Sequence, residues 1–113
     1  MINHQCPFCD KEIILRPIGY QNEFKGACDH LLINWSCRYY IRGMDDKITE
    51  TEFNFPYKGD YLNIIQYPST NKLIIMKPPM VNDQFRIELP LFDIDYKDIP
   101  KLQKKISTYI LLS

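Results

Sequence analysis

Two cysteines near the start of the chain, Cys6 and Cys9, are separated by Pro7 and Phe8. Thiols at this spacing support two kinds of chemistry. They can form and break a disulfide in a redox enzyme, or they can bind a metal ion as thiolates. The first makes a catalyst, whereas the second stabilises a fold, and the residues around the pair distinguish the two.

The Cys-Pro-Phe-Cys sequence resembles the active-site motif of glutaredoxins, in which a strand leads into the motif and a helix begins at it. Only five residues precede Cys6, too few for such a strand. Residues 10–17, DKEIILRP, are β-like and end in a proline, and no alternating βαβ pattern follows. A glutaredoxin-like thiol oxidoreductase that uses Cys6 and Cys9 is therefore only a remote alternative.

The same residues resemble the knuckle of zinc ribbons, a turn in which two thiolates bind one ion while backbone amides point at the sulfurs. Such turns often have Gly after the second Cys, because the backbone there adopts positive φ. Asp10 occupies that position, and Asp tolerates positive φ better than most residues. We therefore predict a zinc-binding turn at residues 6–9.

A tetrahedral zinc ion held by the knuckle needs two more ligands. We prefer Cys28 and His30, which are one residue apart in a Gly-Ala-Cys-Asp-His segment that we interpret as a tight turn. Cys37 in place of His30 is the alternative, although its alternation with Trp35 indicates a buried thiol on the apolar face of a strand. The predicted Zn²⁺ ligands are Cys6, Cys9, Cys28 and His30.

A zinc ion with four protein ligands has no open position for water, so we expect a structural site. Metal binding would then contribute folding free energy to residues 1–40. We expect His4, the other histidine, to lie on the surface.

Catalytic motifs do not appear elsewhere: there is no GxGxxG, P-loop or GxSxG sequence. We interpret the cluster of Asp93, Asp95 and Asp98 as a solvated helix entry, and Glu50 and Glu52 as the solvent face of a strand. The sequence therefore favours a protein that is not an enzyme.

The net charge of zero makes non-specific nucleic-acid binding less favoured than protein binding. Arg38, Tyr40 and Arg42 nevertheless share one face of a predicted strand, so a nucleic-acid-binding zinc protein stays as the alternative. The aromatic content of 13% could supply an exposed patch or free edge strand for a protein partner. The sequence does not identify that partner.

A length of 113 residues predicts one domain, and the hydrophobic and charged fractions of 45% and 25% are those of globular proteins. The N-terminus has no signal-peptide pattern and no apolar stretch is long enough to span a membrane. We therefore expect a cytoplasmic protein, whose cysteines are thiols or metal ligands rather than disulfides.

Alternating apolar residues and intervening turn residues predict a β-rich chain. The expected strands cover residues 12–16, 20–27, 31–42, 48–55, 61–67, 72–77 and 84–89. We expect Pro17 to end the first strand and Gly26 to interrupt the second. The expected core residues of the sheet are Trp35, Tyr39, Ile41, Phe53, Ile65, Ile74, Phe85 and Ile87.

Spacings of three and four after Pro90 predict a C-terminal amphipathic helix. Its apolar stripe comprises Ile99, Leu102, Ile106 and Ile110, which we expect to pack on one face of the sheet. Asp98 is the expected N-cap, and Pro100 falls in the first turn, where its missing N–H costs little.

Together these elements predict an α+β fold for a single domain, residues 1–113. It has a zinc ribbon-like knuckle in a zinc-binding section (1–43), an antiparallel sheet of five to seven strands whose β-sheet section covers 44–95, and a C-terminal helix (96–113). This order, with the CPFC knuckle, resembles small uncharacterised zinc ribbon-like proteins of tailed phages. The resemblance implies an accessory role in the host cytoplasm, in which a zinc-stabilised module binds a host or defence complex.

Overall fold

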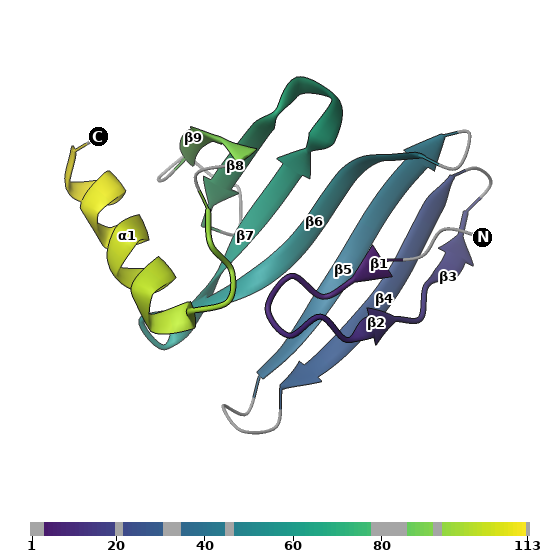
Figure 1. Cartoon of the computed structure of the whole chain (residues 1–113), viewed down its shortest axis with the longest axis horizontal. Helices are drawn as coiled ribbons and strands as arrows, with labels where there is room; N and C mark the ends of the chain where they lie inside the picture. Colours follow the sequence, from purple (N-terminus) through teal and green to yellow (C-terminus); the bar gives the residue numbers. More distant parts are fainter. Residues whose placement is uncertain are drawn as a thin grey trace.

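Seven consecutive strands form one antiparallel sheet in the computed structural model of the chain, and each strand pairs with the next one in sequence (Figure 1). The structure describes residues 4–19, 22–30, 35–44, 47–77, 86–91 and 94–112. The strands of this meander are β3 (Arg16–Ile18), β4 (Glu23–His30), β5 (Trp35–Met44), β6 (Lys47–Tyr57), β7 (Asp60–Tyr67), β8 (Lys72–Met76) and β9 (Arg86–Pro90).

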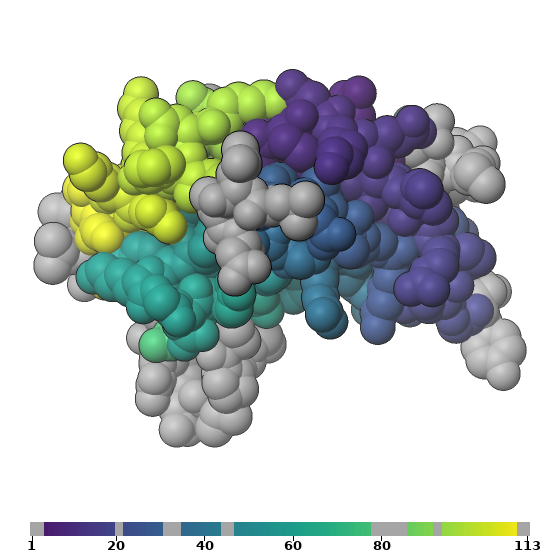
Figure 2. All heavy atoms as spheres, turned by 90° about the horizontal axis from the view of Figure 1, so that it is seen from below, coloured from purple at the N-terminus to yellow at the C-terminus, as the bar shows by residue number. Residues whose placement is uncertain are grey.

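Two further elements cover one face of this sheet. One is a short hairpin of β1 (His4–Gln5) and β2 (Glu12–Ile13), and the other is helix α1 (Ile99–Leu112). Figure 2 shows the N-terminal segment in purple and the helix in yellow along the same side of the strands. We call this side the inner face of the sheet and the opposite side the outer face.

The core lies between the inner face and these two covering elements. Alternation along β5 and β6 directs Tyr39, Ile41, Phe53 and Phe55 inward, and each is at most 2% exposed. Phe8, from the loop of the small hairpin, packs against both phenylalanines with ring centroids 5.6 and 5.7 Å apart. The N-terminal segment therefore shares one core with the central strands.

The C-terminal helix begins directly after the predicted N-cap Asp98, three residues later than the start of the predicted helical section at residue 96. The backbone N–H of Lys101 donates to the Asp98 carboxylate at 3.1 Å, which is the N-cap hydrogen bond. Leu102 and Ile106 are buried in the core, while Ile99 and Ile110 are half-buried at its edge. Tyr57 Oη lies 2.7 Å from Ser107 Oγ and ties the helix to β6.

Two boundaries of the first strands differ from the prediction. Pro17 lies inside β3, which is an edge strand, where the missing N–H of proline costs no ladder hydrogen bond. Gly26 does not break β4. A Cβ at Gly26 would come within 2.6 Å of Ile13 Cγ2 and 2.8 Å of the Ile14 carbonyl oxygen. Glycine is therefore needed because the chain between β2 and β3 crosses β4 closely.

The predicted core is largely confirmed, except that Ile64 and not Ile65 lies on the inner face of the sheet. Ile64, fully buried, faces inward on β7, and Ile65 is half-buried on the outer face. Adjacent isoleucines leave the face undetermined, and the alternation that starts at Leu62 decides it. Ile74 is buried as predicted, but it pairs with Ile65 and shares its face. Phe85 lies outside the described residues.

The predicted fold class is confirmed: the chain has an α+β layout, with seven antiparallel strands, a small N-terminal sheet and one C-terminal helix. In the described part of the chain, the one α-helix is too short and too polar to cross a membrane.

Candidate metal centre

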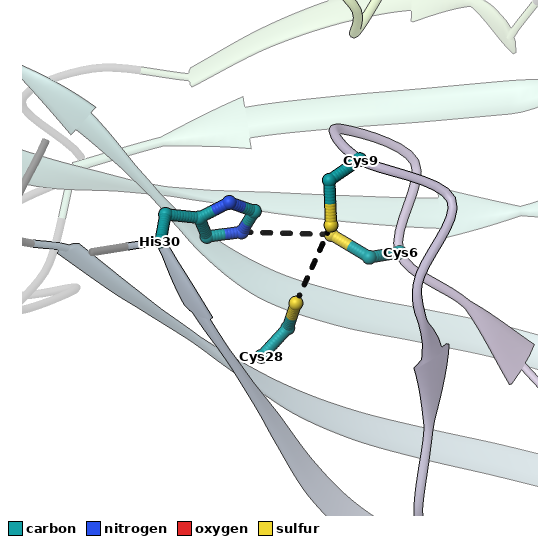
Figure 3. Close-up of side chains that lie close together, drawn as sticks. All are labelled: Cys6, Cys9, Cys28 and His30. Atoms are coloured by element: carbon teal, nitrogen blue, oxygen red, sulfur yellow. Dashed lines mark hydrogen bonds between the residues drawn. The ribbon is translucent and has the colours of Figure 1, made fainter. Parts of the chain in front are cut away.

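The Cys-Pro-Phe-Cys segment forms the tight loop of the small N-terminal hairpin. The Cys6 N–H donates to the Lys11 carbonyl at 2.8 Å, and the Asp10 N–H donates to the Cys6 carbonyl at 2.7 Å. Asp10 has a φ of 63°, as its place in the predicted knuckle requires. These bonds turn the chain back on itself, so that both cysteine side chains lie on the side of the loop that faces β4 (Figure 3).

Cys28 and His30 are on strand β4 rather than in the tight turn that we predicted. Side chains two residues apart on a strand point to the same face, so both project from the inner face toward the hairpin loop. On a strand, a Cys-x-His spacing is therefore enough to direct both side chains to one site. Both residues do lie near the knuckle cysteines, but the tight turn expected for them was wrong.

The fold brings together the four residues Cys6, Cys9, Cys28 and His30 (Figure 3). Their ligand atoms all lie within 4.8 Å of one another, close enough to hold one metal ion. Cys6 Sγ is 3.6 Å from His30 Nε2, and Cys9 Sγ is 3.6 Å from Cys28 Sγ. A disulfide needs about 2.05 Å between its sulfurs, so Cys9 and Cys28 are not bonded.

Cys37, the alternative ligand, lies directly beside this cluster. Its side chain is fully buried, and its Sγ is 3.3 Å from His30 Nε2. Burial raises the pKa of the Cys37 thiol, and so does its hydrogen bond to Cys6. Cys37 therefore lies beside the four-residue cluster but outside it, while Cys28, although also buried, belongs to it.

Several hydrogen-bond donors converge on the sulfur of Cys6. The Cys37 thiol lowers the pKa of Cys6, as do the Tyr39 hydroxyl and the backbone N–H groups of Phe8 and Cys9, and together they outweigh burial and bring it to about 4. The Tyr39 hydroxyl is 3.1 Å from Cys6 Sγ. These donors prepare Cys6 as a thiolate, which is the protonation state that binds metal ions.

Cys28 has the opposite character. Its pKa is raised to about 12, first by burial and then by its hydrogen bond to Cys9. Burial and neighbouring sulfur thus disfavour a free Cys28 thiolate, and a bound cation would supply the positive charge that allows Cys28 to lose its proton.

Aromatic rings form the wall of the site. The imidazole of His30 stacks on the indole of Trp35 with centroids 4.6 Å apart, and Phe8 packs edge-on against both. This stacking fixes the orientation of the His30 ring. His4 does not lie on the surface as predicted: it is half-buried against Tyr39, with ring centroids 5.4 Å apart.

Sequence reasoning missed two supports of the site. Tyr39 was identified only as a core residue, although its position two residues after Cys37 places both on the same strand face. Lys97, in the segment before the helix, forms an ion pair with Asp10 of the knuckle. This pair depends on the tertiary fold, and no local sequence signal indicates it.

Three of the carboxylates that we considered for chemistry form structural contacts in the described part of the chain. Asp95 and Asp98 accept backbone hydrogen bonds before and at the start of the helix, and Asp93 lies outside the described residues. Glu50 pairs with Arg42 at 3.7 Å. Arg38, Tyr40 and Arg42 alternate with the buried residues of β5 and so share the outer face, as predicted.

Comparison of the chain with known protein families, with curated proteins and with solved structures found no match.

Proposed function

We propose that Cys6, Cys9, Cys28 and His30 hold one Zn²⁺ ion in a structural site, and that the chain is a zinc-stabilised protein-interaction module. The convergence of these four ligand atoms within 4.8 Å carries the proposal. Zinc–sulfur and zinc–nitrogen bonds of ordinary length give a tetrahedron with edges of about 3.6 to 3.8 Å. The Sγ–Sγ and Sγ–Nε2 distances of 3.6 Å fit these edges.

The donor set also favours zinc over other common ions. Three thiolates and an imidazole suit Zn²⁺, whereas Mg²⁺ and Ca²⁺ prefer carboxylate and carbonyl oxygens. Four protein ligands leave no position for a water molecule or a substrate, so the ion would have no catalytic role. It would join the hairpin loop to β4. This link would stabilise a chain of 113 residues, whose core is small.

Binding, rather than catalysis, is the function that such a site supports. The metal would hold the hairpin loop against the inner face of the sheet, and the outer face would be free to bind a partner. The resemblance to zinc ribbon-like phage proteins supports an accessory role in the host cytoplasm, where the module would bind a host or defence complex.

Metal analysis of the purified chain tests the proposal, combined with thermal melts before and after a strong chelator. We expect one zinc per chain and a melting temperature that falls by more than about 15 °C on chelation, because metal binding contributes folding free energy. A metal-free chain in which Cys6 and Cys9 are oxidised and reduced reversibly would instead support a thiol oxidoreductase.

A further inference from the structure

The outer face of the sheet carries an open groove of about 770 Å³. Strands β3 to β7 form its floor, and the chain between β2 and β3 forms one margin. The lining side chains that matter for the argument are Ile14, Arg16, Lys25, Arg38, Glu52 and Tyr61.

Three cations in the groove lack carboxylate partners. Arg16 lies directly opposite Lys25 across β3 and β4, and Arg38 lies on the same face of β5. All three are exposed, and none forms an ion pair within the described part of the chain. Arg42, on the same face, differs because it lies 3.7 Å from both Glu23 and Glu50.

The groove is therefore positive in a chain that is neutral overall. Glu52 is the carboxylate that lines it among the described residues, against three cations. The chain as a whole has 14 basic and 14 acidic residues, so the local excess of cations is not a consequence of the overall charge. A ligand with several negative charges complements this surface.

The groove also exposes apolar surface. Ile14 is 85% exposed and Tyr61 is 44% exposed, the two large hydrophobic residues most open to solvent in the described part of the chain. Both line this groove. Exposed apolar side chains beside polar ones are typical of interaction surfaces.

We propose that this groove binds an extended acidic segment of a partner protein, whose carboxylates contact Arg16, Lys25 and Arg38 and whose apolar side chains contact Ile14 and Tyr61. The inference rests on the proposed function as an interaction module and names the chemistry of its partner. We favour a peptide over a nucleic acid because Ile14, the most exposed large hydrophobic side chain in the described residues, complements an apolar side chain and not a base, although Tyr40 and Tyr61 also line the groove.

A peptide selection tests this inference on the full, zinc-loaded chain. A yeast-displayed library of random 12-residue peptides is selected against the protein, and the enriched peptides are measured by fluorescence anisotropy. We expect enriched peptides that combine Asp or Glu with apolar residues, and an affinity that weakens with added salt. Arg38→Glu should weaken binding at least tenfold, whereas Lys104→Glu, the same charge change on an exposed helix position, should change it less than twofold.

Three results would overturn the inference: failure to enrich any peptide, enriched peptides without an acidic excess, or affinities that Arg38→Glu leaves unchanged. A dT12 oligonucleotide that binds more tightly than the peptides, and loses affinity in Arg38→Glu, would assign the groove to nucleic acid instead. Zinc content measured on the same samples separates this inference from the metal proposal. Selection of acidic peptides by a zinc-free chain would reject only the metal site.

Discussion

Cys28 on β4 and Cys37 on β5 lie directly opposite each other, yet only Cys28 belongs to the four-residue cluster. Both side chains project from the inner face, and both are buried. The difference lies in their neighbours. Cys28 Sγ is 3.6 Å from Cys9 of the hairpin loop, whereas Cys37 Sγ is 3.3 Å from His30 and hydrogen-bonds to Cys6. Cys37 is thus a thiol outside the cluster that lies beside His30, the proposed fourth ligand.

Replacing His30 and Cys37 one at a time identifies the fourth ligand. We expect His30→Ala to bind zinc much more weakly, because it removes one of the four proposed ligands and leaves only the buried Cys37 thiol beside the vacated position. Cys37→Ala should retain one zinc per chain and lose about 1 kcal/mol of stability, as expected for truncating a buried side chain. Metal analysis and urea denaturation of both variants provide the measurement. Loss of zinc in Cys37→Ala with retention in His30→Ala would exchange the two roles.

Tyr39→Phe removes the hydroxyl that donates to Cys6 Sγ at 3.1 Å. We expect zinc affinity to fall about 10- to 100-fold, as is typical when a hydrogen bond to a ligand is lost. Competition with a chromogenic chelator measures this affinity. Tyr96→Phe is the matched control, because it removes a hydroxyl that accepts a hydrogen bond from Gln66 at 2.6 Å, without touching a cysteine. Equal losses of affinity in the two variants would contradict a specific role for Tyr39.

Gly26→Ala tests the close crossing of the N-terminal segment over β4. The added Cβ would meet Ile13 Cγ2 at 2.6 Å, so the segment must shift. We expect a loss of about 1–3 kcal/mol in the free energy of unfolding, the usual cost of overpacking. Zinc affinity should also fall, since the shifted segment carries Cys6 and Cys9. Ala27→Ser, at the next and exposed position of the strand, should leave both quantities nearly unchanged in urea denaturation and chelator competition.

Glu52 provides a test of pH dependence. Burial raises its pKa above the ordinary value of 4.5, and the neighbouring Glu50 raises it further. A carboxyl that holds its proton more tightly in the folded state stabilises the fold below pH 4.5, and this contribution is lost as the pH rises through the raised pKa.

We therefore expect Glu52→Gln to be more stable relative to the wild type at pH 7 than at pH 4, in urea denaturation at each pH. Glu88→Gln, an exposed carboxyl in surface ion pairs, should show no such gain. A wild type that is favoured over Glu52→Gln as the pH rises would contradict the assigned direction of the Glu52 pKa.

Local patterns predicted the sheet and the helix because each depends on neighbouring residues. The alternation of Trp35, Tyr39 and Ile41 defines one strand face, and Asp98 caps the helix where the apolar stripe begins. Two adjacent apolar residues carry no such periodicity, and for this reason the prediction that placed Ile65 rather than Ile64 in the core was wrong.

The proximity of the four candidate ligands agrees with the sequence prediction, but their geometry could not be predicted. Cysteine and histidine are few in this chain, so spacing alone reduced the candidates to a small set. The placement of Cys28 and His30 on a strand depends on pairing with β5, and the support from Tyr39 and Lys97 depends on contacts between distant segments. Tertiary structure therefore supplies what the motif alone cannot indicate.

The four proposed ligands all lie between residues 6 and 30, in the first third of the chain. During synthesis they leave the ribosome before the segments that form β6 to β9 and the helix. Cys6 and Cys9 can take up an ion as soon as their loop closes, whereas Cys28 and His30 share a face only once β4 is extended against β5. A nascent chain that has already acquired its ion would therefore hold the N-terminal loop against the β4–β5 hairpin, while the remaining strands are still being translated.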